Sequence, residues 1–155
     1  MKSESGFAVR AARREDVDAL VRLLGVLFSI ESDFQPDAAR QRRGLALLLD
    51  DPWRCAVFVA ERAGAVLGMV TAQLVVSTAE GTFSAVVEDM IVDARERGRG
   101  VGAALLRAGE AWAATRGATR LQLLADRENR SALGFYDRMG WRPTALVCWR
   151  HGGVS

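Results

Sequence analysis

The chain has 155 residues, 50% of them hydrophobic and 26% charged, and its formal net charge is +2. This size and composition suit one globular domain over residues 1–155 with a core of its own. The low charge, with no basic run interleaved with aromatic residues, argues against a nucleic-acid-binding protein. Residues 1–6 lead into no signal peptide, and no apolar run reaches the roughly 18 residues of a membrane span. We therefore expect a soluble, cytoplasmic protein that does not act at a membrane.

Two cysteines, Cys55 and Cys148, lie in apolar, strand-like segments without the spacing of metal ligands. We expect buried thiols in a reducing compartment, and no metal site.

The first third of the chain predicts one strand and two helices. Residues 7–10 form a short strand, and acidic residues within 14–18 open a helix at the end where the helix dipole favours them. Valines and leucines at helical spacing continue this helix to Leu27. The segment Phe28–Pro36 breaks the pattern with aromatic and acidic residues, and a second helix follows from about Asp37 to Leu49.

From Arg54 the hydrophobic pattern takes the two-residue period of a β-strand. We expect strands at 55–60, 66–76 and 82–92, with a hairpin turn ending at Gly64 and a bulge marked by Gly68. Since each strand follows the previous one through a short turn, the three predict an antiparallel meander.

A glycine-rich turn follows the third of these strands. Gly98, Gly100 and Gly102 stand at every second position, which lets the backbone approach a bulky group without interference from Cβ atoms. The next helix leaves its first N–H groups unpaired beside the turn, and Arg97 and Arg99 add two positive charges. Strand, turn and helix together predict a site for an anion, most naturally a pyrophosphate.

The last third predicts a helix from Val101 to a cap at Gly117, and then a short strand at 121–124. This strand lies parallel to the preceding one if the crossover has the usual right hand. A second helix at 129–139 ends before Gly140, and Trp141–Trp149 is expected to form the last strand.

Three interpretations of the glycine turn can be compared. A P-loop fails because no Lys-Ser/Thr pair follows the last glycine. A dinucleotide fingerprint fits Gly98-x-Gly100-x-x-Ala103 with Asp126 downstream, although such folds begin with this motif. The pattern Arg97-x-x-Gly100-x-Gly102 resembles the acyl-coenzyme A signature of the GCN5-related N-acetyltransferases (GNAT). Residues 129–141 resemble a second pattern of this family, with an asparagine, an alanine three residues later, an aromatic-tyrosine pair, and a glycine before a large aromatic residue.

The resemblance implies an α/β (α+β) GNAT fold, with a mixed, mostly antiparallel sheet splayed between strands 4 and 5 and about four helices. It implies acetyl-CoA as co-substrate, with the pantetheine arm bonded to main-chain groups of the fourth strand. The contacts implied for acetyl-CoA are Met90, Ile91, Val92, Arg97, Gly98, Arg99, Gly100, Val101, Gly102, Ala103, Asn129, Ala132 and Arg138.

Acetyl transfer to an amine needs a base for the ammonium and an acid for the departing thiolate. Tyr136 is the candidate acid, because it matches the family tyrosine and shares a helix face with Asn129. Glu88 is the candidate base, because Glu88-Asp89-Met90-x-Val92 resembles the run in polyamine-acetylating members. Strand alternation sends Glu88 and Asp89 to opposite faces. The alternatives are a salt-bridged Glu88, an Asn129 that only caps its helix and a Tyr136 that only packs.

The acceptor is expected to be a small-molecule or peptide amine, bound where the family places its acceptor loop. Phe28, Glu31 and Asp33 in this loop, together with Asp89, could hold a cationic amine with an apolar body. A solvated loop is the alternative. Two other functions stay open: a non-catalytic acyl-CoA sensor and a module that binds NAD. The sequence does not fix the oligomeric state; a homodimer is common among the proteins it resembles.

Overall fold

The computed structural model describes residues 6–31 and 33–153. The first five residues, on which the expected lack of a signal peptide partly depends, lie outside the described residues. The chain forms two compact parts: an N-terminal part that ends at Leu123 and a C-terminal part that begins at Leu124. No helix in the described residues is long and apolar enough to span a bilayer.

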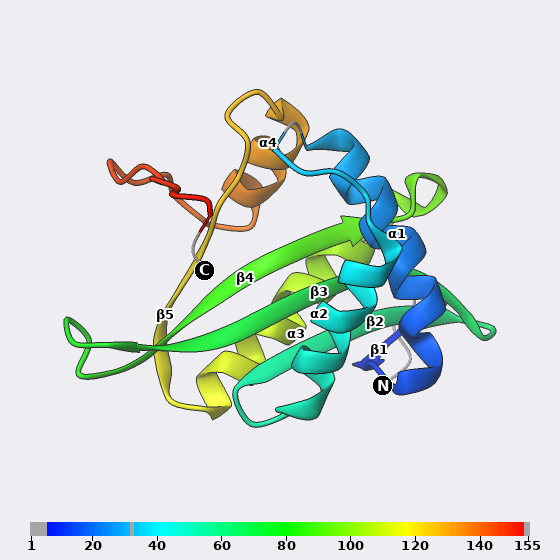
Figure 1. The fold of residues 1–155 in the computed structure, drawn as a ribbon, viewed down its shortest axis with the longest axis horizontal. Coiled ribbons are helices and arrows are strands. Elements are labelled where there is room, and N and C mark those ends of the chain that lie inside the picture. Colours follow the sequence, from blue (N-terminus) through cyan, green and yellow to red (C-terminus); the bar gives the residue numbers. More distant parts are fainter. Residues whose placement is uncertain (1–5, 32, 154–155) are drawn as a thin grey trace. The chain divides into compact units, whose positions relative to one another are not determined.

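The N-terminal part is built on a mixed sheet with its strands in sequence order (Figure 1). β1 to β4 pair antiparallel, and β5 pairs parallel to β4 after a helical crossover. The predicted meander and the parallel fifth strand are thus confirmed. The strands are β1 (Ala8–Ala11), β2 (Cys55–Arg62), β3 (Ala65–Ser77), β4 (Thr82–Val92) and β5 (Ala118–Leu123).

Helices cover both faces of this sheet (Figure 1). A short 3-10 helix η1 (Arg14–Asp16) leads into α1 (Val17–Ile30), and α2 (Ala38–Asp50) begins where the Asp37 side chain accepts a bond from the Arg40 N–H. Both lie on one face, and α3 (Val101–Thr115) lies on the other.

We call the first face the α1–α2 face. Its buried core joins leucines of the two helices to residues of β2, β3 and β4: Leu20, Leu23, Leu24, Leu45, Val57, Val59, Met69 and Ile91. The opposite side is the α3 face.

Gly68 fixes how closely α3 approaches the sheet. A Cβ at this position would lie 2.9 Å from the Ile91 carbonyl oxygen and 3.1 Å from Leu105 Cδ1 on α3. The pairing of β2 with β3 shifts by one residue at this point, between Ala60 and Glu61, so the predicted bulge is confirmed. The glycine at 68 therefore serves close packing, as expected for a glycine inside a strand.

The contact between β4 and β5 covers only the first half of β4. Their register runs from Phe83–Ala118 to Val87–Leu123, whereas β4 continues to Val92. Within the N-terminal part, residues 90–92 of β4 therefore pair only with β3, and residues 88 and 89 lie at a shift of the β3–β4 register. This is the strand separation that the resemblance implies, and it leaves main-chain groups of these residues without a β5 partner.

The C-terminal part contains one helix, α4 (Arg130–Arg138), which ends before Gly140 with a φ of 88°. The strand predicted at 141–149 is wrong: residues 141–150 have no strand pairing. A strand needs a partner, and the described residues of this part contain no other strand. Local bonds form instead, from Arg142 to Asp137 and from the Leu146 N–H to Thr144 Oγ1. Cys148 is exposed, so the expectation of two buried thiols is also wrong.

Candidate functional site

The glycine turn lies between β4 and α3, as predicted. Gly98 and Gly100 have φ values of 72° and 80°, in the left-handed region that strains residues with a Cβ. Gly100 is the N-cap of α3 and supplies no side-chain cap, so the first N–H groups of the helix have no partner within the helix. No described protein atom lies within 4 Å of a Cβ built at either glycine. The turn therefore presents open backbone donors at the positive end of a helix.

The two arginines of the turn have different surroundings. Arg97 donates from Nε to the Val92 carbonyl at 3.3 Å and so ties the turn to the end of β4. Arg99 lies 3.7 Å from Glu96, whose other carboxylate oxygen pairs with Arg62 at 2.5 Å. The positive charge at 99 is thus partly balanced by a neighbouring carboxylate. Arg97, with its exposed side chain, adds the less compensated charge to the predicted anion site.

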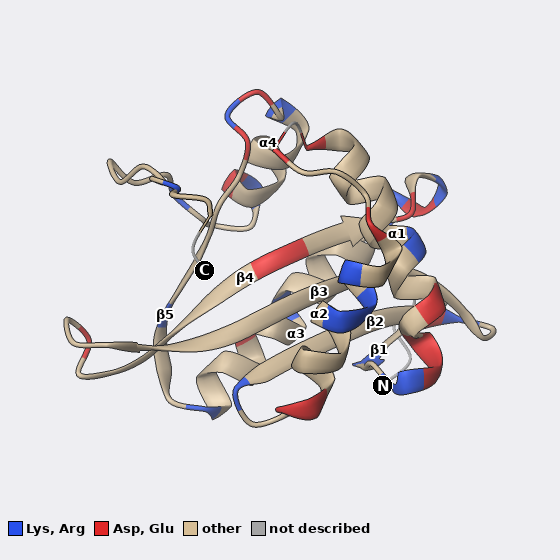
Figure 2. Cartoon of the chain, in the orientation of Figure 1, with Lys and Arg blue, Asp and Glu red and all other residues tan. Residues whose placement is uncertain are grey.

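A β-bulge in β4 changes the prediction for the acidic pair. Val87 pairs with Ala72 and Met90 pairs with Val70, so Glu88 and Asp89 together lie opposite the single residue 71 of β3. Two residues opposite one is a bulge, at which the regular alternation of side chains is lost. Alternation therefore does not fix the faces of Glu88 and Asp89 here, and their placement on opposite faces stays a prediction. Figure 2 shows the acidic segment in the otherwise uncharged middle of β4.

Thr71 and Asp89 bond to each other across this bulge. The Asp89 N–H donates to Thr71 Oγ1 at 3.0 Å, and the Thr71 hydroxyl donates to Asp89 Oδ2 at 3.2 Å. Burial raises the pKa of the Asp89 carboxyl from 3.8 to about 6; the Thr71 bond lowers this pKa and the charge of Glu88 raises it. Glu88 itself is exposed. The bulge thus holds an exposed carboxylate beside a desolvated one.

The register assigns Asp89 to the α1–α2 face. Thr71 follows Met69 by two residues on β3 and pairs with Val57 on β2, and both of these belong to the core of that face. Since Asp89 bonds to the Thr71 hydroxyl, its carboxylate lies on the same side. Phe28, at the end of α1, packs against the same core. The structure therefore brings two of the predicted acceptor residues, Phe28 and Asp89, to one face of the sheet.

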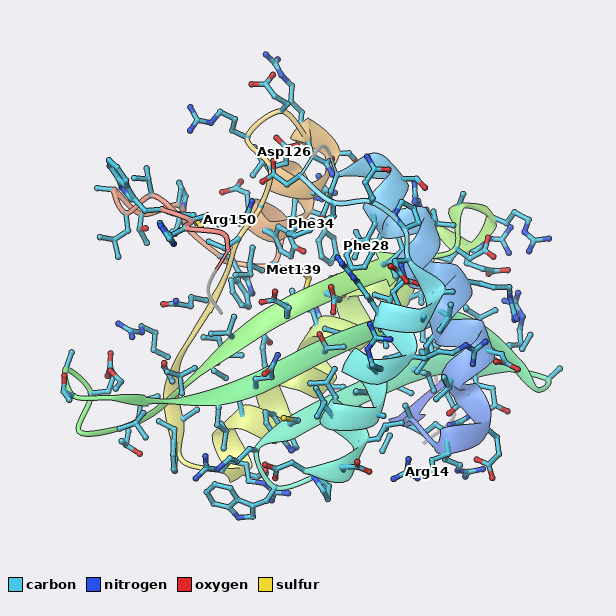
Figure 3. The ribbon with its side chains drawn as sticks, in the orientation of Figure 1. Arg14, Phe28, Phe34, Asp126, Met139 and Arg150 are labelled. Atoms are coloured by element: carbon cyan, nitrogen blue, oxygen red, sulfur yellow. The ribbon has the colours of Figure 1, made fainter. Side chains whose placement is uncertain are left out.

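The rest of the predicted acceptor loop follows α1. Phe34 packs against Phe28 with ring centroids 5.6 Å apart and ring planes tilted by 49°, and Figure 3 shows the two side chains close together. Glu31 is half-buried at the end of α1, and Asp33 is exposed. Among the residues that the structure describes, no group of three or more histidines, cysteines or carboxylates could hold a metal ion.

In the C-terminal part, Asn129 caps α4. Its side-chain oxygen accepts a bond from the Ala132 N–H at 3.2 Å, which is the capping role considered for it. Tyr136 lies on the same helix, half-buried, with its ring 5.3 Å from Phe135 and 6.1 Å from Trp141. The Tyr136 ring thus packs against two aromatic neighbours of the same part of the chain. The catalytic role of Tyr136 stays a prediction.

The residue that sequence reasoning missed is Thr71. No motif includes it, and it lies in the apolar run of β3. A signal was present all the same, because a hydroxyl in the centre of a buried strand must find a hydrogen-bond partner.

The sheet order, the separation of β4 from β5 and the glycine turn at the start of α3 match the fold that the resemblance implies rather than an NAD-binding module, whose sheet would be parallel around the motif. Asp126, the acidic residue of the NAD interpretation, instead accepts a bond from the Glu128 N–H in the turn before α4. Residues 20–141 match the model of the acetyltransferase (GNAT) family, and the chain belongs to this family. Acetyl-CoA is the co-substrate of this class of enzyme, as the sequence predicted.

Three comparisons place the chain among similar proteins. It is 36% identical over 105 residues to a mycothiol acetyltransferase of Thermobispora bispora, a match that covers 64% of this chain and 35% of the relative. The chain thus matches about a third of the length of that relative. The fold is similar to a putative acetyltransferase from Agrobacterium tumefaciens (TM-score 0.80, 24% identity, 94% and 99% of the two chains). It is also similar to an aminoglycoside N-acetyltransferase in complex with CoA (TM-score 0.81, 17% identity, 94% of each chain).

Proposed function

We propose that this chain, as one domain, transfers an acetyl group from acetyl-CoA to a primary amine by direct attack while both substrates are bound. The observation that carries the proposal is the family match over residues 20–141, which includes the glycine turn. The geometry of the turn supports it, because unpaired N–H groups at the N-terminus of α3 suit a pyrophosphate.

Each of the two parts of the chain contains residues that we propose as contacts to acetyl-CoA. In the N-terminal part they are the main chain of Met90–Val92, the side chain of Arg97 and the first turn of α3. Residues 88–92 lack a β5 partner there, so an extended pantetheine arm can bond to them as a strand would. In the C-terminal part, Asn129, Ala132 and Arg138 stay proposed on the strength of the motif alone. When bound, acetyl-CoA supplies a thioester whose thiol is a moderate leaving group.

Glu88 is the proposed base. An amine of lysine type has a pKa of about 10, so it is bound as an ammonium and must lose a proton before it attacks. Glu88 is exposed on the bulge, where it can take this proton directly or through a water molecule. Tyr136 is the proposed acid for the departing thiolate, a role assigned from its position on α4 and its match to the family tyrosine.

The proposed acceptor is a cationic amine with an apolar body. Phe28 and Phe34 offer an aromatic surface, and Asp89, Glu31 and Asp33 offer carboxylates. The names of two relatives mention mycothiol and aminoglycosides, which makes amino-sugar compounds a sensible part of an amine panel. A cytoplasmic location and a homodimer also remain proposals.

The test is a thiol-release assay with acetyl-CoA across polyamines, amino sugars, aminoglycosides, amino acids and peptides. Turnover of at least one amine, with a matching acetylated product, is expected. A protein that binds acetyl-CoA but acetylates no amine would be a sensor, and the enzymatic proposal would be wrong. Loss of turnover in Glu88→Gln with unchanged acetyl-CoA binding would support the base in particular.

A further inference from the structure

The hydroxyl of Thr71 lies in the interior of the sheet, where a polar group needs a partner. The residue is 0% exposed and is flanked on β3 by Val70 and Ala72, which are 1% exposed. The Thr71 hydroxyl bonds twice to Asp89: it accepts from the Asp89 N–H and donates to the carboxylate. Thr71 thus fixes the backbone and the side chain of Asp89 together, and a valine in its place could do neither.

The β4 bulge explains why this pair exists. Glu88 and Asp89 share one position opposite β3, and a bulge leaves one residue outside the regular ladder. At this bulge the Asp89 N–H donates to the Thr71 side chain. The distortion re-aims the Asp89 side chain, as bulges near functional sites often do.

The carboxylate reaches the face that the acceptor loop covers. Phe28 packs against the core that contains Ile91, two residues after Asp89 on β4. Burying a carboxylate beside apolar groups is costly unless a cation or several donors accompany it. Thr71 supplies one hydroxyl donor to Asp89, and none of the ion pairs found in the described residues includes Asp89. A bound ammonium group would supply the missing charge.

We propose that Thr71 is a positioning residue for the acceptor: its hydroxyl holds the Asp89 carboxylate on the α1–α2 face, where this carboxylate receives the ammonium group of the amine. Glu88, exposed on the same bulge, keeps the separate role of base. The inference rests on the proposed function and assigns one step of it, amine recognition, to a residue outside every motif.

The first test needs no substrate. Carboxyl carbon NMR follows the titration of Asp89 in the wild type, Thr71→Val and Thr71→Ser. Because the Thr71 bond lowers the pKa of Asp89, the valine variant should titrate at higher pH, and the serine variant should titrate like the wild type. An Asp89 titration that is identical in the wild type and Thr71→Val would overturn the inference.

The second test measures steady-state kinetics with spermidine and sisomicin as amine probes. In Thr71→Val the KM for the amine should rise roughly tenfold, the scale of one lost bond to a charged group, while kcat and the KM for acetyl-CoA change little. Thr71→Ser should restore the wild-type KM. Ser84→Ala is the control, because it removes a different buried hydroxyl, which lies on β4 five residues before Asp89.

The results separate this inference from the proposed function. An equal fall of kcat for both probes, without a change in the KM for the amine, would contradict a positioning role in amine binding. A KM for the amine that stays raised in Thr71→Ser would contradict this role as well. Failure of the wild type to acetylate any amine of the wider panel would refute the proposed function instead, and the NMR titration would still decide whether Thr71 holds the carboxylate.

Discussion

The raised pKa of Asp89 makes a quantitative prediction for the stability of the protein. In the folded state this pKa is about 6, against 3.8 for an ordinary aspartate. A difference of about two pKa units corresponds to about 3 kcal/mol of unfolding free energy, at 1.36 kcal/mol per unit. Asp89→Asn keeps the shape of the side chain and can still accept the Thr71 bond, but it cannot ionise.

The sign of this pH dependence follows from whether Asp89 loses its proton at lower pH in the folded or in the unfolded chain. Below pH 3.8 the Asp89 carboxyl is neutral in both the folded and the unfolded chain. Between pH 3.8 and about 6 the unfolded chain releases the proton while the folded chain keeps it, so the stability contributed by the neutral carboxyl is lost as pH rises. Above pH 6 the wild type carries the full cost of a buried charge. The stability of Asp89→Asn relative to the wild type should therefore increase by about 2 kcal/mol from pH 4 to pH 7, because part of the full difference already falls below pH 4.

Urea unfolding at pH 4, 5, 6 and 7 measures this difference, and the other carboxylates cancel because they are common to both proteins. Glu88→Gln provides a comparison: removing the charge that raises the pKa of Asp89 should weaken this pH dependence. If the difference in unfolding free energy between the wild type and Asp89→Asn stays constant across this range, the reasoning is refuted. Asp89 would then be ionised in the folded protein at little cost.

Four further predictions concern packing and catalysis. Gly68→Ala should lower the unfolding free energy by roughly 1–3 kcal/mol, because the new methyl group would lie 2.9 Å from the Ile91 carbonyl; an unchanged urea midpoint would contradict this. Gly100→Val should abolish acetyl-CoA binding in calorimetry while circular dichroism stays native, because valine resists a φ of 80°. Tyr136→Phe should lower kcat by roughly 10²–10⁴ with little change in acetyl-CoA affinity; a wild-type rate would remove the acid assignment. Glu88→Gln should lower kcat on the same scale and spare acetyl-CoA binding; a fall in affinity alone would make Glu88 a binding residue.

Periodicity and turn chemistry were sufficient to predict most of the fold. The strand predicted from Cys55 matches the start of β2, and α3 begins at Val101 as expected. Ala63 and Gly64, with φ values of 50° and 81°, form the hairpin turn that the sequence predicted. These features depend on residues close together in the chain, which is why sequence patterns reveal them.

Other features depend on partners distant in sequence. The Trp141–Trp149 segment has a strand-like pattern, but strand formation needs a neighbour that local sequence does not specify. The β4 bulge depends on the register against β3, so no period could show that Glu88 and Asp89 share one position. Thr71 becomes informative only once its partner is known. The glycine turn was found by motif, and the structure adds that Gly98 and Gly100 have a positive φ, which the motif alone does not show.

The central claim is that this chain acetylates amines with acetyl-CoA. The most direct measurement incubates the wild-type protein with acetyl-CoA and the amine panel, and follows thiol release and product mass together. The account predicts stoichiometric release of coenzyme A and the gain of one acetyl group on at least one amine, both lost in Glu88→Gln. Acetyl-CoA binding without any acetylated product across the panel would contradict it.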